Sequence, residues 1–167
     1  MKQKVKKRMA KGPVILGSSI FLGLTLLLSG SGKLPGHTEF IGTLLHSFWT
    51  PPIAYLIGYC LPWIELILGV LLLIGVFSRI AAGLCLLLTI GFMANNSWAI
   101  SQGMEQFPQC ARCLGFWEEW LGSISPLQVL CLDVVLFCLA LVILLFHPGG
   151  FLTFRPWFIK PREGEKT

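Results

Sequence analysis

The sequence predicts an all-α membrane protein, a four-transmembrane-helix bundle with amphipathic interfacial segments. Hydrophobic residues make up 54% of the 167 residues and charged residues only 13%, whereas soluble domains carry about 25% charged residues. The mean hydropathy is +0.75. Four apolar runs also approach the roughly 20 residues that a helix needs to cross a bilayer. One integral membrane domain, residues 1–167, accounts for the whole chain.

Prolines and short polar segments mark the ends of the four spans. The first begins at Pro13, and the second follows Pro51 and Pro52. The third begins just after Arg79, so the connection before it is short enough to force an antiparallel hairpin. Pro126 opens the fourth span, and the run that starts at His147 contains Pro and Gly residues that end it. We therefore expect spans at residues 13–32, 52–77, 80–100 and 127–147.

The distribution of Lys and Arg predicts the orientation. Eleven of the 13 lie before the first span, between the second and third, or after the fourth, against Lys33 and Arg112 in the other two loops. By the positive-inside rule both termini are cytoplasmic, and loops 33–51 and 101–126 face outward from the plasma membrane. Basic residues placed by topology do not indicate nucleic-acid binding. A cleaved signal peptide over residues 1–32 is an alternative that leaves the later spans in the same orientation.

Three segments have the composition of interfacial structure. Residues 40–48 carry apolar side chains at helical spacing, and Trp117 and Trp120 flank two glutamates in the second outward loop. We expect both to lie flat on the outer surface of the membrane. The tail at 151–160 mixes aromatic and basic residues, which predicts the cytoplasmic interface.

The first outward loop also contains His37, Glu39 and His46, which we interpret as solvated loop residues. A zinc site would need these histidines together with two cysteines of the second loop. Their spacing matches no zinc motif, so we expect no metal.

One cysteine pair has a spacing typical of redox chemistry: Cys110-Ala111-Arg112-Cys113. A cation between the two sulfurs favours the thiolate form. In an oxidising compartment such a pair can persist as a disulfide or exchange with the thiols of a partner. A structural disulfide that fixes the loop fits the same residues, and Cys131 is another pairing partner for Cys110.

Polar side chains inside the spans form a second group of candidates. Glu65 and Asp133 are carboxylic acids at membrane depth, where charged groups tend to pair or to face the bundle interior. Asp133 lies at a depth similar to that of Asn95 and Asn96, so the three are expected to form one cluster. The hydroxyls of span one are expected to bond Glu65; these are Ser18, Ser19 and Thr25. The alternative role for the two acids and the two asparagines is to hold the bundle together by hydrogen bonds between helices.

In the order of its motifs, the chain resembles the DoxX and MauE group of small four-helix membrane proteins. Span one ends in the Ser-Gly-x-Gly-Lys-Leu run of residues 29–34. Residues 62–69 are similar to the group's Pro-x-x-Glu-Leu-x-x-Gly signature, and Arg79 follows as expected. Residues 110–115 take the place of a Cys-Gly-Cys-Phe-Gly motif, with two residues rather than one between the cysteines.

The resemblance, over about residues 13–146, implies a redox-associated role. Such proteins are linked to a periplasmic thioredoxin-like protein that forms disulfides, or to a thiosulfate:quinone oxidoreductase as a membrane subunit. It implies that Glu65, Cys110, Cys113 and Asp133 are the functional positions.

From the residues and the resemblance we expect an outward-facing thiol pair at Cys110 and Cys113, with Arg112 favouring thiolate. Electrons would pass to a quinone or to a secreted thioredoxin-like partner. The alternative is a noncatalytic anchor or accessory subunit of a larger respiratory or dehydrogenase complex in the bilayer.

Overall fold

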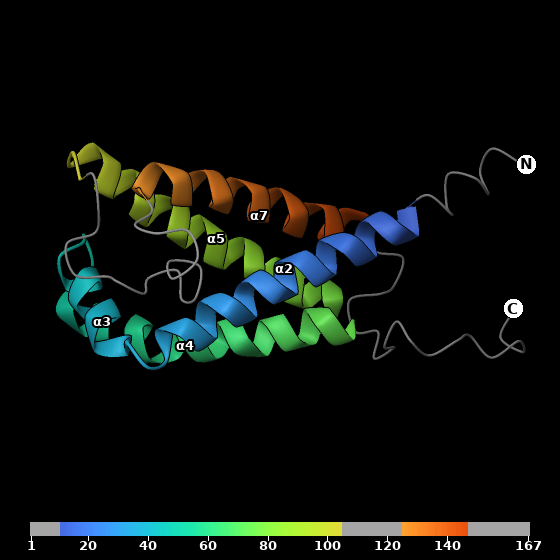
Figure 1. The fold of residues 1–167 in the computed structure, drawn as a ribbon, viewed down its shortest axis with the longest axis horizontal. Coiled ribbons are helices and arrows are strands. Elements are labelled where there is room, and N and C mark those ends of the chain that lie inside the picture. The colour runs from blue at the N-terminus through green and yellow to red at the C-terminus, as the bar shows by residue number, and fades with distance from the viewer. Residues whose placement is uncertain (1–10, 105–124, 147–167) are drawn as a thin grey trace, which may run out of the picture.

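A computed structural model describes residues 11–104 and 125–146, and all the regular secondary structure in these ranges is helical. The helices are α2 (Lys11–Lys33), α3 (His37–Leu45), α4 (Pro51–Ile74), α5 (Ser78–Ser101) and α7 (Pro126–Phe146). The four long helices run along the bundle, and short α3 lies at one end (Figure 1). All four are long and apolar enough to cross a membrane, which confirms the four predicted spans. The chain is a multi-pass membrane protein.

The connection between α4 and α5 shows why the second span ends earlier than predicted. Gly75 adopts a left-handed conformation with φ of 79°, and its N–H donates to the carbonyl of Leu71. This is the usual way in which a glycine ends a helix. Phe77 is also left-handed, with φ of 49°, and α5 begins at the next residue. The predicted short antiparallel hairpin is confirmed, but the helix ends at Ile74 rather than at 77.

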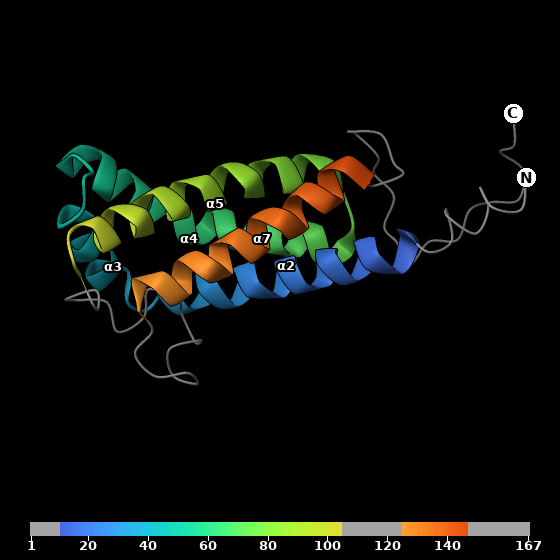
Figure 2. The same ribbon diagram turned by 90° about the horizontal axis from the view of Figure 1, so that it is seen from above.

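Successive long helices run in opposite directions. Helix α2 begins, and α7 ends, at one end of the bundle, whereas α3 lies at the other (Figures 1 and 2). Helix α2 packs most extensively on α4, and α5 on α7. The end of α5 and the start of α7 therefore lie at the same end as α3, which we call the α3 end.

The interior between the helices combines leucines with small residues. Buried leucines of α2 and α4, such as Leu22 and Leu72, meet small residues of α5 and α7. Large apolar side chains elsewhere face outward, as Leu87 does with 66% of its surface exposed. This pattern is expected of a membrane bundle, because lipid accepts apolar side chains and small residues allow helices to approach closely.

Helix α3 confirms the predicted helical spacing and shows what its apolar side packs against. Its apolar residues Phe40, Ile41 and Leu44 are buried, and they pack with α4 residues such as Ala54 and Leu61. A Cβ at Gly58 of α4 would collide with Ile41, so the glycine admits the close approach of α3. The apolar side of α3 therefore covers α4, a protein contact that apolar spacing alone does not distinguish from a contact with lipid.

Candidate functional site

The centre of the site is an ion pair between α2 and α4. Lys33 Nζ donates to Glu65 Oε1 at 2.6 Å, and the two side chains are 4% and 0% exposed. The sequence prediction placed Lys33 in the outward loop, but the structure makes it the buried last residue of α2. A basic side chain at the end of an apolar span, on the side where basic residues are rare, was the signal for this role.

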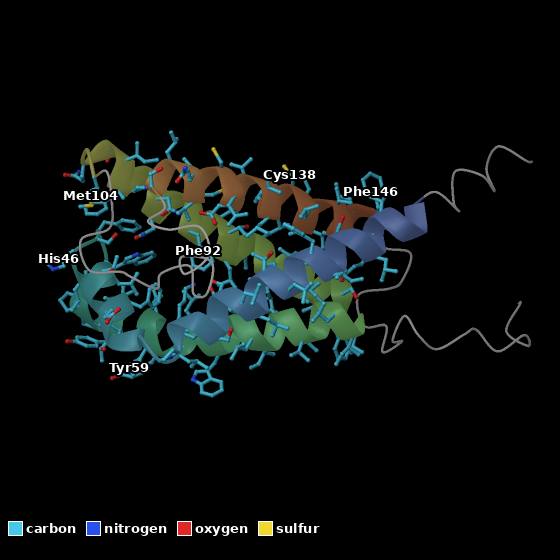
Figure 3. The ribbon with its side chains drawn as sticks, in the orientation of Figure 1. His46, Tyr59, Phe92, Met104, Cys138 and Phe146 are labelled. Carbon is cyan, nitrogen blue, oxygen red and sulfur yellow. The ribbon has the colours of Figure 1, made fainter. Side chains whose placement is uncertain are left out.

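Two aromatic rings complete the surroundings of the ammonium group. Lys33 Nζ lies 5.2 Å from the centroid of Phe40 in α3 and 4.9 Å from that of Phe92 in α5. Both distances fall within the range for cation–π attraction. Figure 3 labels Phe92, which lies toward the α3 end, far from Phe146 at the opposite end. Three other helices, α3, α4 and α5, thus each contribute a side chain to the environment of Lys33.

The Glu65 carboxylate is only half satisfied. Its Oε2 atom is buried and has no hydrogen-bond partner among the described residues. The Ser29 hydroxyl of α2 is near enough to act on the carboxylate, although it makes no hydrogen bond with Oε2. An unsatisfied oxygen of this kind costs about 1–3 kcal/mol, so it marks a place where a proton or a polar group would be stabilised.

A second polar pair lies close to the first. Asn96 Nδ2 of α5 donates to Asp133 Oδ2 of α7 at 2.7 Å, and both residues are buried. Helix α2 packs on both α4 and α7, so the two pairs share the bundle interior, where the charges of Lys33 and Glu65 act on Asp133. We call Lys33, Glu65, Asn96 and Asp133 the polar cluster.

Asn95 does not join the polar cluster, which corrects the prediction that both asparagines would. Its Oδ1 accepts from Ser47 Oγ at 2.6 Å and from Trp49 Nε1 at 3.3 Å. Adjacent residues on a helix point about 100° apart, so two neighbouring asparagines face different partners. Asn95 instead fixes the connection between α3 and α4 to α5.

Two of the hydroxyls that were expected to bond Glu65 have other acceptors. Ser19 Oγ donates to the carbonyl of Leu72 at 2.7 Å, and Thr25 Oγ1 donates to Phe21 in its own helix. The ammonium of Lys33 donates to Glu65 Oε1, and the hydroxyl of span one that acts on this carboxylate is that of Ser29. Ser18, the third hydroxyl that was expected to bond Glu65, is buried in the bundle.

The predicted redox residues Cys110, Arg112 and Cys113 lie outside the described residues. Cys131 and Cys138 in α7 are exposed free thiols, and Cys138 points away from the bundle (Figure 3). Helix α5 ends at Ser101 and α7 begins at Pro126. These two helix ends, between which the Cys-x-x-Cys pair lies in the sequence, are both at the α3 end (Figure 1).

Among known protein families, residues 11–146 match the family described as methylamine utilisation protein MauE. The match spans all four long helices and includes both members of each polar pair. The chain belongs to the MauE family. No curated protein and no solved structure matches it. The predicted resemblance to the DoxX and MauE group is thereby confirmed.

Proposed function

We propose that this MauE-family protein carries out thiol–disulfide exchange on the outer side of the plasma membrane, through Cys110 and Cys113. The observation that carries the proposal is the position of the pair in the sequence. It lies between the end of α5 and the start of α7, which are at the α3 end (Figure 1). This position in the chain supports exchange with a partner outside the bilayer.

The orientation follows from the same charge distribution that the sequence shows. With Lys33 buried in an ion pair, Arg112 is the remaining basic residue of the two outward loops. The asymmetry in Lys and Arg therefore favours cytoplasmic termini more strongly, which supports an outward-facing loop 101–126.

The chemistry conserves atoms and electrons. When the two thiols form a disulfide, they lose two electrons and two protons. A quinone takes up both and becomes a quinol, or the disulfide of a thioredoxin-like partner takes them up and becomes a dithiol. Arg112, between the two sulfurs, favours the thiolate that attacks.

Thiol trapping in intact cells tests the proposal. A membrane-impermeant maleimide shifts the mass of the protein for each free outward thiol. We expect Cys110 and Cys113 to be protected during respiration and labelled when electron flow is blocked. C113S should leave Cys110 unable to form this disulfide and abolish the exchange. C138S is the matched control, because Cys138 is an exposed thiol on the surface of α7, and it should change nothing.

Protection that persists until a strong reductant is added would contradict a redox role. Such a result would mean that the disulfide is structural, and it would favour the accessory-subunit alternative. Copurification of the protein with a larger complex at fixed stoichiometry would then identify that complex.

A further inference from the structure

We infer that Lys33, Glu65 and Asp133 form a proton-binding site, in which Lys33 neutralises one carboxylate and the carboxyl group of Asp133 holds an exchangeable proton. The inference uses only described residues and does not depend on thiol exchange. Its ligand is a proton taken from water, and the reversible step is formation and cleavage of one O–H bond at Asp133.

The charges of the polar cluster do not balance when both acids are ionised. Lys33 supplies one positive charge and pairs directly with Glu65 at 2.6 Å. Asp133 is 3% exposed, and its recorded donor is the neutral amide of Asn96. An ionised Asp133 would therefore leave a net negative charge buried in an apolar bundle, which is costly at membrane depth. One bound proton makes the cluster neutral.

The charged and polar side chains that act on Asp133 lie on three other helices. Lys33 of α2, Glu65 of α4 and Asn96 of α5 act on it. On its own helix, Cys131 is exposed. Lys33 is a cation that acts on Asp133, and it is already engaged by Glu65.

The hydrogen-bond geometry locates the proton. Asp133 Oδ2 accepts from Asn96 Nδ2 at 2.7 Å, so Oδ1 is the oxygen that can carry hydrogen. The other carboxyl group of the polar cluster also has hydrogen-bonding capacity left over. Glu65 Oε2 is buried and has no hydrogen-bond partner in the part of the chain that the structure describes, although Glu65 is 0% exposed. This oxygen is a free acceptor to which a donor group can bind.

Two measurements on the purified full-length protein test the inference. Dicyclohexylcarbodiimide is an apolar reagent that modifies protonated carboxyl groups in membrane interiors, and mass spectrometry locates the adduct. Infrared spectroscopy detects the C=O stretch of a protonated carboxylic acid without needing access for a reagent. The variants are D133N, K33M and the charge-conserving control K33R.

We expect a carbodiimide adduct on Asp133 that decreases as the pH is raised, together with an infrared acid band that D133N lacks. K33M should add a second adduct at Glu65, because that carboxyl group then has no counter-charge and is stabilised by a proton. K33R should keep the wild-type single adduct. Absence of the acid band in the wild type at every pH, or a band that persists unchanged in D133N, would overturn the assignment to Asp133.

The test of proton binding and the test of thiol exchange can succeed or fail independently. D133N removes the proton site and leaves both outward cysteines in place, whereas C113S removes the thiol pair and leaves the polar cluster intact. An Asp133 acid band that survives in C113S is the expected result, whether or not thiol exchange occurs.

Discussion

Lys33 Nζ and Glu65 Oε1 lie 2.6 Å apart, although 32 residues separate them in the chain. Their contact ties the last residue of α2 to the middle of α4, and two aromatic rings cover the ammonium. A buried pair of this kind is sensitive to the loss of either partner alone, because the remaining charge is left uncompensated.

Removing one partner of this pair should destabilise the bundle strongly. We expect K33M and E65Q each to lower the free energy of unfolding, with K33M losing about 3–5 kcal/mol because Glu65 loses its counter-charge and stays buried only by taking up a proton. The double variant K33M/E65M replaces both partners with apolar side chains and should recover most of this loss. Denaturant titration of the purified protein in detergent micelles gives these values. Losses that simply add in the double variant would show that the two side chains do not interact.

The position of the ion pair could have been inferred only in part from the sequence. Apolar runs and prolines predicted the four spans, because helix length and helix ends depend on local composition. Glu65 was identified as a candidate because an acid within a span is rare. Lys33 was assigned to a loop, because counting basic residues by side treats each one as solvated, and only tertiary packing shows that its side chain turns inward to Glu65.

The sequence pattern also could not predict that Asn95 and Asn96 bond different partners. Depth along a helix was estimated correctly for both, since it depends only on the rise per residue. Their partners depend on the rotation of α5 relative to α3 and α7, which adjacent residues sample differently. Asn96 therefore meets Asp133, and Asn95 meets Ser47.

The two hydroxyls of α2 should contribute unequally to stability. Ser19 bonds the carbonyl of Leu72 across the α2–α4 interface, whereas Thr25 bonds within its own helix. We expect S19A to lose about 0.6 kcal/mol, the average for such interhelical bonds in membranes. T25V keeps the shape of the side chain and should leave the unfolding midpoint unchanged. A larger loss in T25V than in S19A, in the same detergent titration, would contradict this assignment of partners.

The close approach of α2 and α4 at Gly69 should not tolerate a methyl group. A Cβ at Gly69 would lie 2.9 Å from the Gly23 carbonyl oxygen and 2.8 Å from Leu27 Cγ. The backbone of α2 would have to shift, so we expect G69A to lose about 1–3 kcal/mol. Gly83 of α5 is the matched control, because a Cβ there meets nothing within 4 Å. G83A should gain up to about 1 kcal/mol from helix propensity. Thermal unfolding in detergent that moves in the same direction for both variants would disprove the close contact.

The last prediction concerns how the α3 end is held in place. Asn95 receives hydrogen bonds from Ser47 and Trp49, so it joins the connection after α3 to helix α5. N95A removes both acceptor contacts and should increase amide hydrogen exchange over residues 46–50, with little change in α2, because local opening follows the loss of local contacts.

N96A is the matched control at the neighbouring position. It should leave exchange over 46–50 unchanged and lower global stability by about 1–3 kcal/mol, because it deprives buried Asp133 of its donor. Hydrogen exchange with mass spectrometry compares the two variants directly, and equal effects on residues 46–50 would mean that Asn95 is not the anchor of this connection.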